Sequence, residues 1–247
     1  MTQTFDLSAI VAALPEDDRY RTFRRLVTVL ASIETTICDL QDAHSAVEVA
    51  QAMLAAGGFN QPAEAMKLEA LMVYAVICYC RALHSGPIDR QRVGPGKRPH
   101  HLRTAHDQIV VLRDQVFAHY GHGERHEDGR WRDEPFVMRA KENSVSFGYA
   151  SSRAAFREQV IVDLDALIAA AIPQLRATSV VKQGELAAEV ERLGDDAEFV
   201  RIARSKRFDA IQFFRGREVG ESPSLEYLVG RGVVRSPDTT QKPTESE

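Results

Sequence analysis

The stretch "FRRLVTVLASIETTICDLQDAHSAVEVAQAML", residues 23–54, repeats apolar side chains at alternating intervals of three and four positions. The repeat runs through Phe23, Leu26, Leu30, Ile33, Ile37, Leu40, His44, Val47, Gln51 and Leu54. Such spacing places one apolar seam along a single helix, as in helix bundles and coiled coils. It predicts one long helix, or two nearly collinear ones, that begins after Pro15 and ends near Ala56. We interpret His44 and Gln51, which interrupt the seam, as register-setting or partly hydrated core positions rather than ligands. A helix of this length overhangs a small bundle, which favours a homodimer.

Three further stretches with helical spacing of apolar residues predict shorter helices. They run from Pro62 to about Gly86, from Leu102 to about Gly121, and from about Ser152 to Ile172, where Pro173 is expected to end the helix. The Gly- and Pro-rich basic segment 85–101 predicts a loop. The stretches "PFVMRA" and "SVSFGYA" flank "KEN", which predicts a short β-hairpin at 135–150.

The expected fold is therefore mainly α: a bundle of four or five helices, one of them very long, with a short β-hairpin and a C-terminal extension. We expect the bundle and hairpin to occupy residues 1–172. Residues 173–231 would form a helical C-terminal extension with two shorter helices, at 183–194 and 195–204. The tail, residues 232–247, is nearly free of apolar residues and is expected to be disordered.

The overall composition is typical of a globular protein in water, with 44% hydrophobic and 27% charged residues. The most apolar run, "ALMVYAVICYC", has 11 residues, fewer than the roughly 18 that a membrane helix needs. No signal peptide is evident at the N-terminus, so we expect a cytoplasmic protein that does not associate with membranes. Cys38, Cys78 and Cys80 show no CxxC spacing and are interpreted as small buried residues.

The net charge of −4 argues against nucleic-acid binding through overall charge, but the charge is unevenly distributed. Residues 90–132 hold nine Lys/Arg against five Asp/Glu, which makes this segment +4, and they contain six of the eight histidines. The basic side chains are suited to guide RNA by attraction to phosphates, although a solvated loop has the same composition. The positions in question are Arg90, Arg92, Lys97, Arg98 and Arg103, with Tyr120 as an aromatic that can either stack on a base or pack at the helix end.

The stretch "LRDQVFAH", residues 112–119, closes the third predicted helix with polar groups. On an α-helical wheel Arg113 and His119 lie on opposite edges of the apolar stripe, whereas Asp114 points away from it. Arg113 and His119 are about 9 Å apart along such a helix. Both side chains can then reach a groove beside the packed face. Arg113 and His119 can bind one phosphate together if Arg113 is extended, or if a second chain presents the same face.

This stretch resembles the R-x(4–6)-H motif of the HEPN superfamily, here Arg113, Asp114 and His119, and the resemblance covers about residues 16–172. Many HEPN proteins are metal-independent ribonucleases of toxin, phage-defence and RNA-processing systems, in which the motifs of two protomers face each other. The resemblance implies that His119 acts as general acid or base at the 2′-hydroxyl. It implies that Arg113 stabilises the phosphorane and that Asp114 orients Arg113 or His119. The product would be a 2′,3′-cyclic phosphate, and no cofactor would be needed.

Other readings of the same residues remain open at the level of the sequence. HEPN proteins also include catalytically inactive members that dimerise or bind nucleotides or partner proteins, so RNA, a cognate antitoxin and another partner protein are all compatible with the motif. Arg113, Asp114 and His119 can equally be structural residues. His119, His122 and His126 with Glu124 offer zinc or nickel ligands, but Gly121 and Gly123 interrupt the helix that would hold them on one face.

Overall fold

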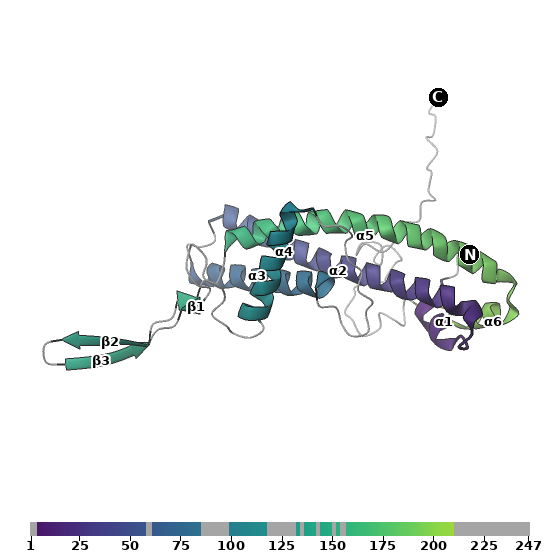
Figure 1. Cartoon of the computed structure of the whole chain (residues 1–247), viewed down its shortest axis with the longest axis horizontal. Coiled ribbons are helices and arrows are strands. Elements are labelled where there is room, and N and C mark those ends of the chain that lie inside the picture. The colour runs from purple at the N-terminus through teal and green to yellow at the C-terminus, as the bar shows by residue number, and fades with distance from the viewer. Residues whose placement is uncertain are drawn as a thin grey trace, which may run out of the picture. The chain divides into compact units, whose positions relative to one another are not determined.

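The computed structural model describes residues 4–57, 61–84, 99–117, 132–133, 136–141, 144–149, 152–153 and 157–209. This part of the chain is mainly helical and carries a small antiparallel sheet, as the sequence predicts (Figure 1). No helix within it is both long enough and apolar enough to cross a membrane. In chain order the elements are α1 (Leu7–Ala13), η1 (Asp18–Tyr20), α2 (Arg21–Ala55), α3 (Pro62–Leu83), α4 (His101–Val111), η3 (Leu112–Phe117), β1 (Arg132–Asp133), β2 (Phe136–Lys141), β3 (Ser144–Tyr149), β4 (Ser152–Arg153), α5 (Glu158–Arg192), η4 (Leu193–Asp195) and α6 (Ala197–Ser205).

The chain divides into two compact units. One comprises residues 29–183, and the other comprises residues 1–28 together with 184–247. The long helices α2 and α5 contribute residues to both units. The candidate site lies in the unit formed by residues 29–183.

The long helix expected from the apolar seam is present as α2, which has 35 residues. The seam is buried as predicted in its first part, but toward the C-terminal end the buried positions move to Ala43 and Ala50. His44 is half-buried and Gln51 is exposed. A straight α-helix has 3.6 residues per turn, so a strict 3.5-residue repeat drifts off the packed face. The prediction that Gln51 is a core position is therefore wrong.

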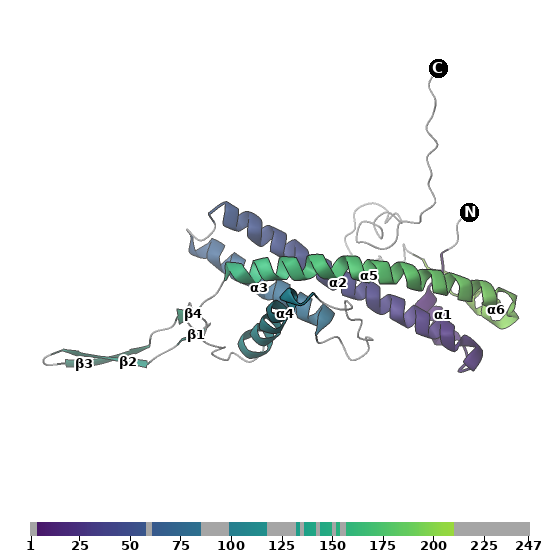
Figure 2. The same cartoon turned by 45° about the horizontal axis from the view of Figure 1, so that its top comes forward.

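In the 29–183 unit, α3 begins at Pro62, where the missing N–H costs no helical hydrogen bond. The second and third predicted helices are confirmed as α3 and α4, and α4 crosses α3 (Figures 1 and 2). The expected end of the third helix at Gly121 lies outside the described residues. The core is formed by apolar side chains of four helices, and its largest fully buried members are Ile33, Leu40, Leu68, Met72, Tyr79, Ile109, Ile161 and Leu164.

The hairpin predicted at 135–150 is confirmed. β2 pairs with β3 in antiparallel register, with Met138 opposite Phe147 and Ala140 opposite Val145. A second, shorter pair, β1 with β4, continues the antiparallel pairing of the two chain segments toward the helices (Figure 2).

The prediction that Pro173 ends the fourth helix is wrong, because α5 runs through it from Glu158 to Arg192. Proline in a helix interior removes one hydrogen bond and costs about 3 kcal/mol. Apolar side chains are buried on both sides of Pro173, including Ala171 and Leu175, and their packing offsets that cost. The helix predicted at 183–194 is thus the last part of α5, whereas the one predicted at 195–204 is present as α6.

In the unit formed by residues 1–28 and 184–247, α6 is fixed to η1 by a polar contact and to the start of α2 by an aromatic one. Asp196 caps α6 by accepting hydrogen bonds from the backbone N–H groups of Glu198 and Phe199. The Tyr20 hydroxyl donates to Asp196 over 3.1 Å, and burial, followed by this hydrogen bond, raises the pKa of Tyr20 to about 12. The Phe199 ring centroid lies 5.1 Å from that of Phe23.

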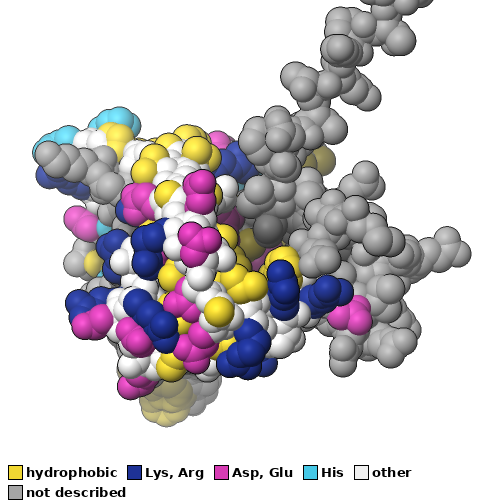
Figure 3. Space-filling model, turned by 90° about the vertical axis from the view of Figure 1, so that its right-hand side faces the viewer, with side chains coloured by type: hydrophobic (Ala, Val, Ile, Leu, Met, Phe, Trp, Pro, Cys, Tyr) yellow, Lys and Arg dark blue, Asp and Glu magenta, His cyan; other side chains and the backbone are white. Residues whose placement is uncertain are grey.

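Basic and acidic side chains are interspersed over the face of the molecule in Figure 3.

Candidate functional site

The candidate site lies where the C-terminal end of α3 meets η3, the segment that continues α4. This segment, Leu112–Phe117, is π-helical rather than α-helical. Short π-helical turns widen the helix by one residue per turn and occur frequently at functional sites. The first part of the "LRDQVFAH" stretch therefore has an unusual backbone, which helical spacing alone does not reveal.

Asp114 joins two cationic or protonatable side chains in this region. Arg113 Nη1 forms an ion pair with Asp114 Oδ1, and Asp114 Oδ2 lies 3.7 Å from Nε2 of His84. The second contact is too long for a hydrogen bond but close enough for an ion pair when the imidazole is protonated. The three side chains are 34% (Arg113), 40% (Asp114) and 37% (His84) exposed, so an incoming anion can reach them.

The position of Asp114 corrects an expectation from the α-helical wheel, on which it points away from the packed face. In the structure it is half-buried and approaches α3 through His84. The wheel assumes 100° per residue, and that assumption fails from Leu112 onward because the backbone is π-helical. Arg113 and Asp114 consequently act as one group on the side of the helix that approaches α3.

Beneath these polar groups, Cys80 is buried and unsuited to nucleophilic chemistry. Burial raises the pKa of Cys80 to about 12, with smaller opposing effects of the charges on Arg113 and Asp114. The reactive form of cysteine is the thiolate, which is scarce at neutral pH when the pKa is so high. The thiol instead contacts the backbone oxygen of Ile109 over 3.9 Å.

His106 fixes α4 to α3 beside the site. Its Nδ1 atom lies 2.8 Å from the Tyr79 hydroxyl, and the two rings meet edge to face with centroids 5.7 Å apart. His106 lies within α4 and is half-buried. The contact makes His106 a structural residue that holds the two helices together.

The described residues include only part of the site expected from the sequence. Arg113 and Asp114 are brought together, and Arg103 is exposed on α4. The other predicted residues lie outside the described part of the chain: His119 of the motif, and Arg98 and Tyr120 of the expected RNA-binding set. The same holds for Arg90, Arg92, Lys97, His122, Glu124 and His126. Within the described ranges, no group of three His, Cys, Asp or Glu side chains is placed to hold a metal ion.

Sequence reasoning missed His84, which follows the last residue of α3 and forms its C-cap. A histidine at this position is favourable because a helix C-terminus attracts positive charge. The signal was available in "YCRALHSG", where a single histidine ends a strongly apolar helix just before a loop.

A second charged pair, between α2 and α3, is structural. Asp39 on α2 is buried and accepts hydrogen bonds from Arg81 Nε at 3.0 Å and Nη2 at 2.6 Å. The hydrogen bond with Asp39 raises the pKa of Arg81. The pair joins α2 to α3 and neutralises a carboxylate that would otherwise be costly to bury.

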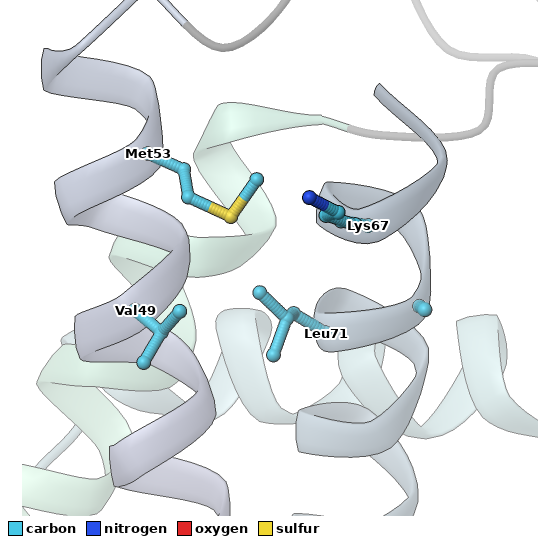
Figure 4. A pocket seen from close by; sticks show the side chains of 5 residues that line it. Val49, Met53, Lys67 and Leu71 are labelled. Carbon is cyan, nitrogen blue, oxygen red and sulfur yellow. The ribbon is translucent and has the colours of Figure 1, made fainter. Parts of the chain in front are cut away.

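A shallow hollow of about 380 Å³ lies between α2 and α3 (Figure 4). Val49 and Met53 of α2 face Leu71 of α3 across it, and Ala70 and Lys67 complete its lining. Lys67 also forms an ion pair with Glu64 over 2.8 Å. The hollow is nearly all apolar, and its one polar lining residue, Lys67, is held by that ion pair.

Comparison with protein-family models gives no match, and no curated protein and no solved structure is significantly similar to the chain.

Proposed function

We propose that the chain is a HEPN-type, metal-independent endoribonuclease of a toxin or phage-defence system. The observation that carries the proposal is the cluster of Arg113, Asp114 and His84 on and beside a π-helical turn. It supplies a fixed cation, a carboxylate that orients it and an imidazole, all partly open to solvent. The motif residue His119 follows in the same stretch of sequence.

In the proposed reaction, a base removes the proton of the RNA 2′-hydroxyl, and the oxygen attacks the adjacent phosphorus. The P–O5′ bond breaks, an acid protonates the leaving 5′-oxygen, and the products are a 2′,3′-cyclic phosphate and a 5′-hydroxyl. His119 serves as one of the two proton-transfer groups, since histidine changes protonation near neutral pH. His84 is the candidate for the other, because it is the imidazole in contact with the Arg113–Asp114 pair.

Arg113 stabilises the additional negative charge that develops on the phosphorane oxygens. Asp114 holds the guanidinium through its ion pair, which reduces the cost of ordering a long side chain when the substrate binds. Arg103, exposed on α4, contributes attraction for the RNA backbone. A homodimer, as the HEPN resemblance implies, would bring two copies of this cluster to one substrate.

The test is RNA cleavage by purified protein in the presence of a metal chelator. We expect Arg113→Ala and His119→Ala each to lower the cleavage rate by at least about a hundredfold, with unchanged helical content. Arg176→Ala and His101→Ala, which remove exposed side chains of the same types from α5 and α4, serve as matched controls and should cleave normally. Equal cleavage by wild type and both motif variants, or the absence of any cleavage by wild type, would refute the proposal.

A second candidate function is a catalytically inactive HEPN-like module that dimerises or binds a partner protein or nucleotide. The apolar hollow between α2 and α3 favours it, as do the exposed side chains of Met66, Tyr74 and Ile77 on α3. Exposed apolar groups of this size are typical of interaction surfaces. Stable binding of a partner without any RNA product, and without sensitivity to Arg113→Ala, would identify this function.

A further inference from the structure

The β2–β3 hairpin has one face that is entirely apolar among the side chains that the structure describes. Because side chains alternate along a strand, Phe136, Met138 and Ala140 of β2 share a face with Val145 and Phe147 of β3. We call these five residues the apolar hairpin face. Phe136 is 73% exposed, Met138 62%, Val145 56% and Phe147 67%.

The opposite face of the same hairpin is different in character. It carries Val137, Arg139, Ser146 and Gly148, and Arg139 is opposite Ser146 in the register. Both polar side chains, Arg139 and Ser146, are exposed, as expected for a face in water. The hairpin is therefore amphipathic. A polar face is expected in water, whereas an exposed apolar face requires an explanation.

An apolar face on two strands is unstable when it remains in water. Isolated two-stranded hairpins are marginally stable, and they need further strands or a helix against a hydrophobic face. The stacking of Phe136 on Phe147, with centroids 6.0 Å apart, covers only part of these rings. The four large side chains expose on the order of 500 Å², near the upper end of the largest apolar patches found on monomeric proteins.

We propose that the apolar hairpin face binds the same face of a second copy of this chain. If fully covered, two such faces together would bury on the order of 1000 Å², which is the lower limit for a specific protein interface. The result is a two-layer, four-stranded sandwich in which each hairpin receives the cover that it lacks alone. A surface that binds its own copy in this way forms a two-fold symmetric dimer.

The distribution of charge favours a second copy over RNA. In the sandwich, Arg139 of each hairpin lies on an outer face, so the two like charges are separated by more than the spacing of about 10 Å between packed sheets. An RNA strand stacked on Phe136 and Phe147 would need cations beside those rings. The described charged side chain of the hairpin, Arg139, lies on the other face. This inference rests on the hairpin alone and does not depend on the proposed ribonuclease activity.

The test compares two lysine substitutions at neighbouring positions of β3 in the full-length chain. Phe147→Lys places a charge on the apolar hairpin face, and Ser146→Lys places the same charge on the polar face. We expect wild type and Ser146→Lys to be dimers by analytical ultracentrifugation, and Phe147→Lys to raise the dimer dissociation constant at least a hundredfold. A monomeric wild type, or a Phe147→Lys protein as dimeric as wild type, would overturn the proposal.

A second measurement separates loss of the interface from loss of the hairpin itself. Hydrogen–deuterium exchange of residues 136–149 in wild type should become faster on dilution, because the dimer protects the strands. Protection that does not depend on protein concentration would contradict the proposal. A monomeric wild type that binds single-stranded oligoribonucleotides, and loses that binding in Phe147→Lys, would instead place RNA on this face and overturn it as well.

Discussion

The Nε2 atom of His84 lies 3.7 Å from Oδ2 of Asp114, which joins the C-terminal end of α3 to the π-helical segment η3. The other carboxylate oxygen of Asp114 pairs with Arg113. One carboxylate thus holds a guanidinium and an imidazole at a partly exposed position. This relationship gives the proposed active site its geometry, and it can be tested by replacing Asp114.

We expect Asp114→Asn to lower RNA cleavage by about ten- to a hundredfold, because the neutral amide no longer orients Arg113 or attracts a protonated His84. The stability of the fold should change by less than about 1 kcal/mol, since the side chains are more than a third exposed. Cleavage assays with parallel urea unfolding would measure both effects. Asp107→Asn, at an exposed position of α4, is the matched control, and equal loss of cleavage in both variants would argue against a specific role for Asp114.

Above pH 9 we expect stability to fall as the unfolded chain loses a proton that the folded chain keeps on Cys80. Burial raises the pKa of the Cys80 thiol from its ordinary value of 9.0 to about 12, so the folded state binds more protons between these values. The contribution is complete below pH 9 and is lost as the pH rises toward 12. Between pH 8 and pH 10 the resulting fall in the free energy of unfolding amounts to about 1 kcal/mol. Urea unfolding of wild type and Cys80→Ala at both pH values would show it, and an equal loss in the two proteins would exclude Cys80 as the cause.

The continuous course of α5 through Pro173 predicts that Pro173→Ala stabilises the protein by about 1–3 kcal/mol, since alanine restores a helical hydrogen bond and favours the helix. Pro15, which lies outside the helices, provides the comparison, and its replacement by alanine should change stability by less than about 0.5 kcal/mol. Thermal unfolding would measure both. A lower melting temperature for Pro173→Ala would show that the proline is accommodated by a local backbone distortion on which the packing depends.

For the Asp39–Arg81 pair we expect Asp39→Ala to destabilise the fold by about 1–2 kcal/mol. The cost is below that of a fully buried pair, because Arg81 is 44% exposed and can be hydrated when its partner is removed. A double-mutant cycle with Arg81→Ala isolates the interaction from the loss of packing. A coupling energy near zero would mean that the two residues contribute independently and that the pair does not join α2 to α3.

The helices could be predicted from the sequence where apolar spacing directly reflects burial, as in α2, α3 and α4. The prediction failed at Gln51, because spacing does not distinguish 3.5 from 3.6 residues per turn over a long helix. It failed at Pro173, because the local cost of proline is visible in the sequence whereas the packing around Ala171 and Leu175 is not. Within the candidate site, Arg113 and Asp114 were found from a local motif. His84 was not, because its contact with Asp114 depends on how α3 packs against η3.

The π-helical turn at Leu112–Phe117 also makes the site depend on the length of the chain and not only on its side chains. A π-helical hydrogen bond joins residues five positions apart, whereas an α-helical one joins residues four positions apart. A π-helical turn therefore holds one extra residue. Deleting a single residue from this segment would allow it to return to 3.6 residues per turn, and because the π-helical turn accommodates the extra residue, the following positions would keep nearly the same faces relative to α4. Only the backbone of the segment itself would change, from a wide π-helical turn to a regular α-helical one. A one-residue deletion is therefore a means of removing the π-helical backbone while leaving both halves of the motif in the sequence.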